Sequence, residues 1–125
     1  MKVLIIEDDK FITKAMKYKF EEKKFTVKTC RTAEDGLETL NSWLPDAIVL
    51  DILLPGIDGY EFLRRVKADS QLKDIPVIVA SNLPKDEEAD IGALEYIVKS
   101  DLDLDTLVKK TIRNIPNHGR TQLRH

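Results

Sequence analysis

The sequence has 125 residues, of which 42% are hydrophobic and 34% are charged. Its length fits one folded domain and leaves little room for a second, and its composition is not that of a disordered chain. The formal net charge is −2, and every acidic residue lies before residue 106. These charges argue against a general nucleic-acid binder, which needs a basic face.

Two further classes of protein are excluded by residue usage. Cys30 is the one cysteine, so neither a disulfide framework nor a cysteine zinc site is expected. No apolar run approaches the ~18–20 residues that span a bilayer. The apolar start of the chain turns acidic at Glu7, which is too early for a secretory signal. We therefore expect a soluble protein of the reducing cytoplasm with no membrane association.

Short apolar runs alternate with amphipathic stretches along the chain. The runs lie at residues 3–6, 25–30, 47–50, 77–80 and 96–98. The first, third and fourth runs show no polar alternation, which is typical of strands buried on both faces of a parallel sheet. Apolar side chains also recur at the spacing of core-packed helices, in residues 11–20, 33–40, 62–66 and 104–112.

Helix-capping residues stand where these helices would begin. Thr32 followed by Asp35 resembles a capping box. Asp103 can cap the last helix, and Asp58-Gly59 precedes the third. The alternation of strands and helices predicts an α/β fold, a doubly wound five-stranded parallel sheet with helices on both faces and right-handed crossovers.

In such a sheet, ligands bind beyond the carboxyl ends of the strands, near the point where the strand order reverses. Polar side chains follow the expected strands at this rim: Glu7, Asp8 and Asp9 after the first, Asp51 after the third, Ser81 after the fourth and Lys99 after the fifth. An acidic loop, a hydroxyl or a lysine at one strand end is commonly only solvated surface. Their convergence on one rim indicates a site.

The acidic side chains of this rim suit phosphoryl transfer with a metal ion. Clustered oxygen donors favour Mg²⁺, or Mn²⁺ in its place. Asp51 follows the most apolar strand and is the best candidate for a carboxylate nucleophile. Glu7 and Asp8 would hold the metal, with the Leu53 backbone carbonyl as a further oxygen. Carboxylates clustered without a cation would repel one another, so the cluster itself argues for a cation.

Across residues 2–112 the sequence closely resembles the receiver domain of two-component response regulators. The resemblance rests on a combination of motifs: Glu7-Asp8, Asp51, Leu54-Pro55-Gly56, Asp58-Gly59, Ser81, Tyr96 and Lys99. It implies a five-stranded doubly wound fold of the flavodoxin-like, receiver type. It also implies that Asp51 accepts a phosphoryl group from a sensor histidine kinase or a phosphotransfer protein.

The resemblance assigns a role to each matching position. The metal ion would be bound by Glu7, Asp8, Asp51 and the carbonyl of Leu53. The phosphoryl group would be bound by Ser81, the N–H of Asn82 and Lys99. Tyr96 would be an aromatic switch that turns inward when Ser81 moves toward the phosphoryl group.

The residues beside the reacting groups bear on how long the phosphoryl group lasts. Leu53 and Leu83 stand two positions after Asp51 and Ser81, where they would flank the path of an attacking water. Neither side chain can orient or activate water. We therefore expect a persistent aspartyl-phosphate.

Two departures from the family pattern concern residues 82–100. Ser100 follows Lys99 where many members have proline, so a trans bond is expected there. Only 18 positions separate Ser81 from Lys99, about four fewer than in typical members, which is about one helical turn. The helix expected within residues 84–91 should therefore be short, and the partner face that it helps to form is altered.

Residues 1–115 are expected to form the receiver domain and residues 116–125 a flexible tail. No effector or DNA-binding domain follows in this sequence, so the resemblance points to a stand-alone regulator or a relay intermediate. It would be a monomer or a weak dimer that signals to a downstream protein. It is not expected to be a turnover enzyme.

Three other interpretations stay open from the sequence. A degenerate receiver would act as a phosphorylation-independent binding scaffold, which the short helix within residues 84–91 allows. A Mg²⁺-dependent phosphatase with an aspartate nucleophile would want an acid where Leu53 stands. A flavodoxin-like nucleotide binder would need a Gly-rich loop after the first strand, where acids stand instead.

Overall fold

The computed structural model describes residues 1–82, 92–93, 95–99 and 103–116. Along these residues the elements are β1 (Lys2–Ile6), α1 (Lys10–Glu22), β2 (Thr26–Cys30), α2 (Ala33–Leu40), β3 (Ala47–Leu50), α3 (Gly59–Ala68), β4 (Val77–Ser81), β5 (Glu95–Val98) and α4 (Leu104–Asn114). The strands pair in parallel in the order β2-β1-β3-β4-β5. This order confirms the predicted doubly wound parallel sheet.

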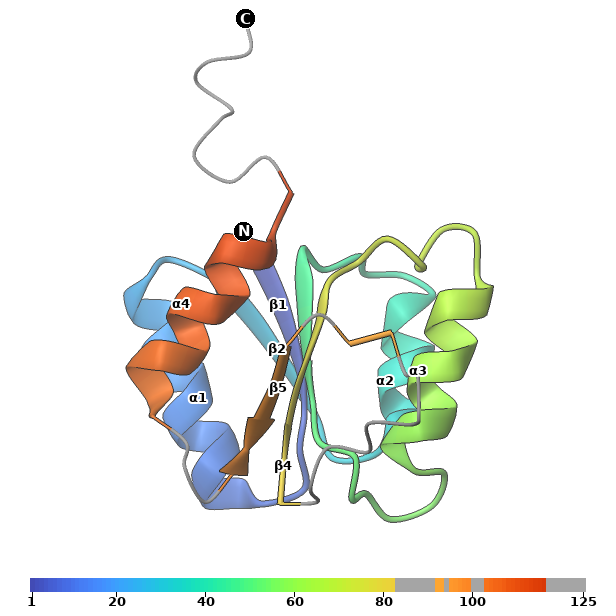
Figure 1. Cartoon of the computed structure of the whole chain (residues 1–125), viewed down its shortest axis with the longest axis horizontal. Coiled ribbons are helices and arrows are strands. Elements are labelled where there is room, and N and C mark those ends of the chain that lie inside the picture. The colour runs from blue at the N-terminus through green and yellow to red at the C-terminus, as the bar shows by residue number, and fades with distance from the viewer. Residues whose placement is uncertain (83–91, 94, 100–102, 117–125) are drawn as a thin grey trace, which may run out of the picture.

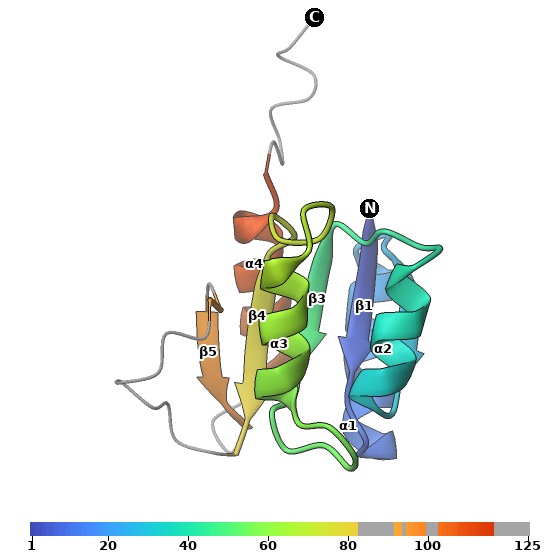
Figure 2. The same ribbon diagram turned by 90° about the vertical axis from the view of Figure 1, so that its right-hand side faces the viewer.

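The described helices cover both faces of the sheet. α1 and α4 lie on one face, and α2 and α3 lie on the other (Figures 1 and 2). Side chains alternate between the faces of a strand. Accordingly, Leu4 and Ile6 join the core under α2 and α3, whereas Val3 and Ile5 join the core under α1 and α4. Burial on both faces explains why β1, β3 and β4 are continuous apolar runs.

Each described helix begins at a side-chain cap. Thr32, Asp58 and Asp103 accept backbone N–H groups at the starts of α2, α3 and α4, at 3.1, 3.0 and 3.2 Å. The caps at Thr32 and Asp103 confirm the sequence prediction, and the cap at Asp58 adds a role for the residue that precedes α3. Asp9 does the same for α1, where its Oδ1 accepts two N–H groups at 2.9 and 3.0 Å. Each such cap stabilises its helix by about 1 kcal/mol.

Several element boundaries differ from the prediction by one residue. Ser81 is the last residue of β4 and pairs with Val98, rather than following the strand. β1 and β5 each begin one residue earlier than expected, at Lys2 and Glu95, and β2 begins one residue later, at Thr26. Lys2, Ser81 and Glu95 are polar and are held by backbone pairing, so the apolar pattern does not mark them. Phe25 is apolar but lies outside β2, because its N–H donates to the Phe20 carbonyl at the end of α1, at 3.1 Å.

Part of the prediction lies outside the described residues. The helix expected within residues 84–91, the bond before Ser100 and the tail from residue 117 belong to this part.

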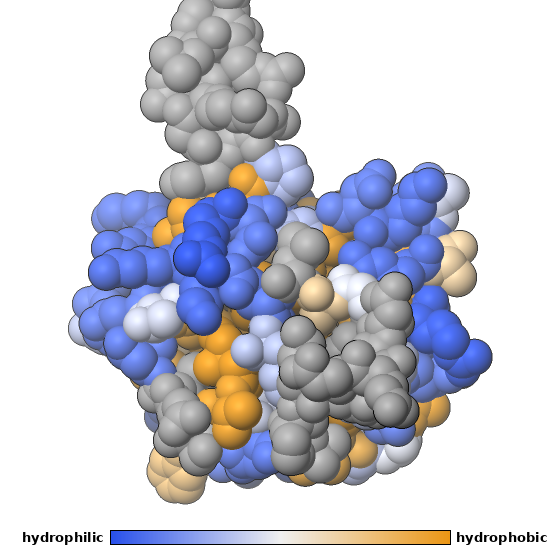
Figure 3. Space-filling model, in the orientation of Figure 1, coloured by the Kyte–Doolittle hydropathy of each residue, from blue (hydrophilic) through white to orange (hydrophobic). Residues whose placement is uncertain are grey.

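Among the described residues, no helix combines the length and the apolar character needed to cross a membrane. Figure 3 shows mostly hydrophilic side chains over α4 and the outer surface of α1.

Glu95 joins β5 to α4. Its Oε2 accepts hydrogen bonds from Arg113 at 2.5 and 3.0 Å and from Asn114 at 2.9 Å, and the Lys110 ammonium lies 4.0 Å from Oε1. Burial would raise the pKa of Glu95, but these hydrogen bonds and charges outweigh burial and place the pKa below its ordinary value of 4.5.

We expect Glu95→Gln to lower the free energy of unfolding by about 1 kcal/mol at neutral pH. A carboxyl with a lowered folded-state pKa stabilises the fold above its unfolded pKa of about 4.5, and this contribution is lost as the pH falls through the folded-state value. Urea unfolding of both proteins at neutral and strongly acidic pH should therefore show a difference that shrinks in acid. A difference of equal size at both pH values would contradict this expectation.

Candidate functional site

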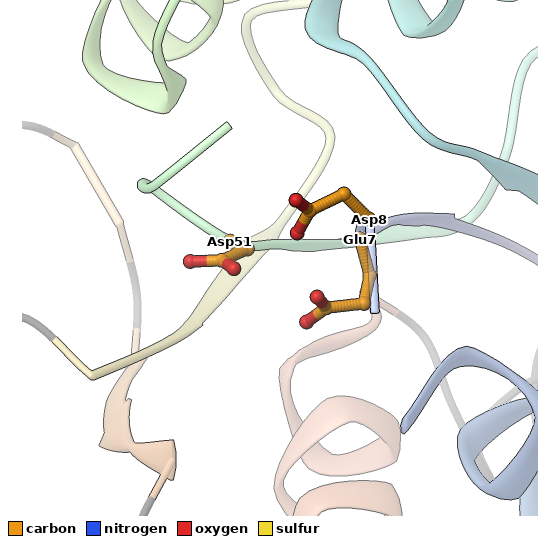
Figure 4. Close-up of side chains that lie close together, drawn as sticks. All are labelled: Glu7, Asp8 and Asp51. Carbon is orange, nitrogen blue, oxygen red and sulfur yellow. The ribbon is translucent and has the colours of Figure 1, made fainter. Parts of the chain in front are cut away.

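The ends of β1 and β3 place Glu7 and Asp51 side by side. Ile6 and Leu50 are partners in the register of these strands, and the N–H of Asp51 donates to the Ile6 carbonyl at 3.0 Å. Carboxylate oxygens of Glu7, Asp8 and Asp51, one from each, lie within 4.8 Å of one another. Figure 4 shows these three side chains gathered at one edge of the sheet, where the sequence predicted a cluster.

Two of the three carboxylates are buried. Glu7 is 2% exposed and Asp51 is 4% exposed, whereas Asp8 is exposed. Backbone groups bond to both buried carboxylates. The Asp9 N–H donates to Glu7 Oε2 at 2.9 Å, and the Leu53 N–H donates to Asp51 Oδ1 at 3.0 Å. A buried charge is tolerated only where such partners compensate for lost hydration.

Lys99 supplies the counter-charge for this cluster. Its ammonium donates to Glu7 Oε1 at 2.7 Å and to Asp51 Oδ2 at 2.9 Å, and 8% of its side chain is exposed. Burial would lower the pKa of Lys99, but the two carboxylates outweigh burial and raise it. Burial also raises the pKa of Glu7; the hydrogen bond from Lys99 opposes this rise, and the charge of Asp51 adds to it. The lysine is therefore protonated between the two carboxylates.

A hydroxyl and a phenol lie on the neighbouring strands. Ser81 ends β4 and is fully buried, and Tyr96 in β5 is half-buried against the core under α2 and α3. Burial raises the pKa of Tyr96, and the nearby Tyr60 and Asp51 add to this rise, while a hydrogen bond with the Ser81 side chain opposes it. Ser81 and Tyr96 are thus linked through their side chains. Asn82 follows Ser81 and is exposed.

Two residues outside the predicted set contact the loop that follows Asp51. Gly59 opens α3 so close to this loop that a Cβ would lie 2.6 Å from Ile52 Cα and 2.7 Å from the Asp51 carbonyl oxygen. Glu34 in α2 accepts the N–H of Ile57 at 3.2 Å. In the sequence, Gly59 belonged to the Asp58-Gly59 motif of the resemblance but had no role assigned to it. The Glu34 contact spans 23 positions, and no sequence pattern marks it.

The model of the response regulator receiver domain family matches residues 3–112 of this chain. The chain belongs to that family. The matched residues run from β1 into α4 and include the acidic cluster, Ser81, Tyr96 and Lys99. The resemblance found in the sequence motifs is therefore confirmed.

Relatives and solved structures agree with this assignment of the receiver domain. The transcriptional regulatory protein AfsQ1 of Streptomyces coelicolor is 38% identical over 103 residues, which cover 78% of this chain and 44% of that protein. The chain spans about half the length of the curated relatives that it matches. The receiver domain of a signal transduction histidine kinase from Syntrophus aciditrophicus has a TM-score of 0.85 and 27% identity, covering 96% of this chain and 93% of that one. The Mn²⁺-bound form of response regulator Rcp1 has a TM-score of 0.74 and 25% identity, covering 88% of each chain.

The side chains of this receiver domain fit a divalent metal ion. The cluster of Glu7, Asp8 and Asp51 offers carboxylate oxygens, which are the donors that Mg²⁺ and Mn²⁺ prefer. With each carboxylate counted as −1 and the Lys99 ammonium as +1, the formal charge of the cluster is −2, which one divalent cation would neutralise. Both the donor chemistry and the charge therefore suit such an ion.

Proposed function

We propose that this receiver domain accepts a phosphoryl group on Asp51 from the phosphohistidine of a sensor histidine kinase or a phosphotransfer protein. The observation that carries this proposal is the position of the Asp51 carboxylate, buried at a strand end among acids and 2.9 Å from the Lys99 ammonium. A carboxylate can act as a nucleophile toward phosphorus. A fixed ammonium beside it stabilises the charge on the phosphoryl oxygens.

In the transfer step, an electron pair of an Asp51 carboxylate oxygen forms the new O–P bond. The P–N bond of the phosphohistidine breaks, and its electron pair stays on the departing imidazole nitrogen. The product is an acyl phosphate on Asp51, which water later cleaves to the carboxylate and inorganic phosphate. Because Asp51 itself carries the group between these steps, the domain acts as a phosphoacceptor rather than as a turnover enzyme.

The metal ion of this reaction would be Mg²⁺, or Mn²⁺ in its place. Its ligands would be the carboxylates of Glu7, Asp8 and Asp51 and the backbone carbonyl of Leu53. When bound, the cation supplies positive charge that stabilises the phosphoryl oxygens during transfer. The acidic cluster of this chain and the Mn²⁺-bound form of Rcp1 support this assignment.

The phosphoryl group would switch the domain through Ser81, the Asn82 N–H and Lys99. Phosphorylation adds about −1.5 to −2 charge and three acceptor oxygens. Hydrogen bonds to charged groups contribute ~1.5–3 kcal/mol each, enough to shift a two-state equilibrium about tenfold or more. Because Ser81 is hydrogen-bonded to Tyr96, movement of Ser81 toward the phosphoryl group would release Tyr96 to change position.

We further propose that the phosphorylated domain signals to a downstream protein in the cytoplasm, as a monomer or a weak dimer. Receiver domains work with histidine kinases, and the free thiol of Cys30 suits a reducing compartment. A phosphorylation-independent scaffold is not favoured, because it would have no need of a buried nucleophile, clustered acids and a lysine in contact with them.

Incubation with phosphoramidate or acetyl phosphate, followed by intact-mass measurement, tests this proposal. Phosphoramidate carries the same P–N bond as a phosphohistidine. We expect one phosphoryl adduct in Mg²⁺ and none when EDTA removes the metal. An adduct that forms equally well in EDTA would contradict the proposed metal role.

The adduct on Asp51 is expected to be long-lived. Leu53 is 53% exposed and carries no group that can activate a water molecule. Leu83, the second residue expected to flank the water path, lies outside the described residues. Leu53→Glu should shorten the half-life of the adduct by roughly 10- to 100-fold. Decay after removal of the donor, with Leu53→Met as the matched control, measures this, and an unchanged half-life in Leu53→Glu would refute it.

A further inference from the structure

The loop between β3 and α3, residues 51–58, includes the Leu53 carbonyl proposed as a metal ligand. Two backbone groups hold the ends of this loop. The Leu53 N–H donates to Asp51 Oδ1 at 3.0 Å, and the Gly59 N–H donates to the Ile52 carbonyl at 2.9 Å. Both contacts lie within or next to the loop. In its outer part, the half-buried side chains of Leu54 and Ile57 pack against the core under α2 and α3, so a polar contact there adds to this apolar packing.

Glu34 holds the outer part of the loop from the neighbouring helix α2. Its Oε2 accepts the Ile57 N–H at 3.2 Å. Its two carboxylate oxygens also lie against Gly56, where a Cβ would be 2.4 and 2.9 Å from them. Gly56 has a φ of +79°, a conformation that glycine adopts readily. Glycine at position 56 therefore leaves room for the Glu34 carboxylate against the loop.

The helix that carries Glu34 is itself firmly packed. α2 begins at its cap, Thr32, and Ala33 beside Glu34 is completely buried. Gly36 lies so close to β1 that a Cβ there would be 2.5 Å from Ile6 Cδ1. A carboxylate in the first turn of a helix is also favoured by the helix dipole. The backbone of Glu34 is thus fixed relative to β1, the strand that leads into Glu7 and Asp8.

We infer that Glu34 is a positioning residue for the metal site. Its carboxylate holds the β3–α3 loop, and with it the Leu53 carbonyl, in one place relative to the acidic cluster. This inference rests on the proposed function, because it concerns the same metal site. Residues that orient a metal ligand without touching the ion commonly change metal affinity by about 10- to 100-fold, and the exposure of Glu34 favours the lower end of that range.

Three variants separate positioning from charge. Glu34→Ala removes the acceptor of the Ile57 N–H. Glu34→Gln keeps an oxygen acceptor on a side chain of the same length and removes only the charge. Glu38→Ala removes the same charge from an exposed position one turn along α2, without touching the loop.

Two measurements read the effect of these variants. Hydrogen exchange of the Ile57 amide, followed by NMR in the metal-free protein, reports the contact itself. Calorimetric titration with Mg²⁺ reports the affinity of the site. We expect Glu34→Ala to speed the exchange of the Ile57 amide and to weaken Mg²⁺ binding roughly 10-fold. In Glu34→Gln and Glu38→Ala, both the exchange rate and the Mg²⁺ affinity should stay within about twofold of the wild-type values.

Unchanged exchange and unchanged Mg²⁺ affinity in Glu34→Ala would overturn the inference. So would a Glu34→Gln variant as weak as Glu34→Ala, because the charge and not the hydrogen bond would then be responsible. A wild-type protein that neither binds Mg²⁺ nor takes up a phosphoryl group would refute the proposed function as well. If the wild type binds Mg²⁺ and takes up a phosphoryl group, but Glu34→Ala changes neither the Ile57 exchange nor the Mg²⁺ affinity, only the positioning role is refuted.

Discussion

Replacement of Lys99 by methionine is expected to lower the free energy of unfolding by about 3 kcal/mol at neutral pH without metal. The Lys99 ammonium is the shared partner of Glu7 and Asp51, which are 2% and 4% exposed. Methionine preserves much of the apolar stem, so the variant removes mainly the charge. Two buried carboxylates would then face each other without a cation. Removal of one partner from a buried ion pair is strongly destabilising, because it leaves the other charge buried and uncompensated.

The loss of stability in Lys99→Met should depend on pH and on Mg²⁺. Burial already raises the pKa of Glu7, and loss of the lysine removes the hydrogen bond that opposes this rise. A carboxyl with a raised folded-state pKa destabilises the fold above that pKa, and the cost disappears as lower pH protonates the group in both states. Mg²⁺ should restore part of the lost stability, because it binds the folded cluster and neutralises the same carboxylates.

Urea unfolding in EDTA and in Mg²⁺ measures both effects. Lys14→Met, at an exposed position of α1, is the matched control and should unfold like the wild type. Equal stability of Lys99→Met and the wild type in EDTA would show that Lys99 is not the counter-charge of the cluster.

The second large effect is expected for Gly59→Ala. At an exposed position inside a helix, replacement of glycine by alanine commonly stabilises a protein by up to about 1 kcal/mol. Here the new Cβ would lie 2.6 Å from Ile52 Cα and 2.7 Å from the Asp51 carbonyl oxygen, and both are backbone atoms. The backbone after Asp51 must shift, so we expect a loss of about 1–3 kcal/mol in the free energy of unfolding. Phosphorylation by acetyl phosphate should slow roughly 10-fold or more, because displacement of a reacting group is costly.

Gly36→Ala provides the comparison for this variant. Its new Cβ would lie 2.5 Å from Ile6 Cδ1 and 3.1 Å from Phe62 Cε2, which are side-chain and not backbone atoms. We therefore expect a smaller loss of stability and a phosphorylation rate close to that of the wild type. If both glycine variants slow phosphorylation equally, the close approach of Gly59 is not what positions Asp51.

The fold could be predicted from the sequence because burial leaves a strong pattern. β3 (Ala47–Leu50) is buried at every position and has no polar residue, so its place in the middle of a parallel sheet is evident. The caps at Thr32 and Asp103 were predictable for a similar reason, since a helix start favours a short polar side chain. Strand ends were predicted less well, because Ser81 joins β4 through backbone pairing and not through apolar character.

The acidic cluster was also predictable, because parallel strands bring their carboxyl ends to one edge of the sheet. The sequence did not reveal which carboxylates the lysine would contact. Lys99 follows the edge strand β5 and reaches past β4 to Glu7 and Asp51, so its contacts depend on side-chain packing. The contacts of Glu34 and Gly59 with the loop after Asp51 were missed for the same reason. Their contacts join different elements in space and follow no local period.

The central claim is that Asp51 carries the phosphoryl group. Its most direct test is the intact mass of the wild type, Asp51→Asn and Asp58→Asn after incubation with acetyl phosphate and Mg²⁺. Asparagine at position 58 keeps a helix cap, so this variant controls for loss of a nearby carboxylate. We predict one phosphoryl adduct on the wild type and on Asp58→Asn and none on Asp51→Asn. An adduct that persists in Asp51→Asn would place the phosphoacceptor elsewhere and contradict the account.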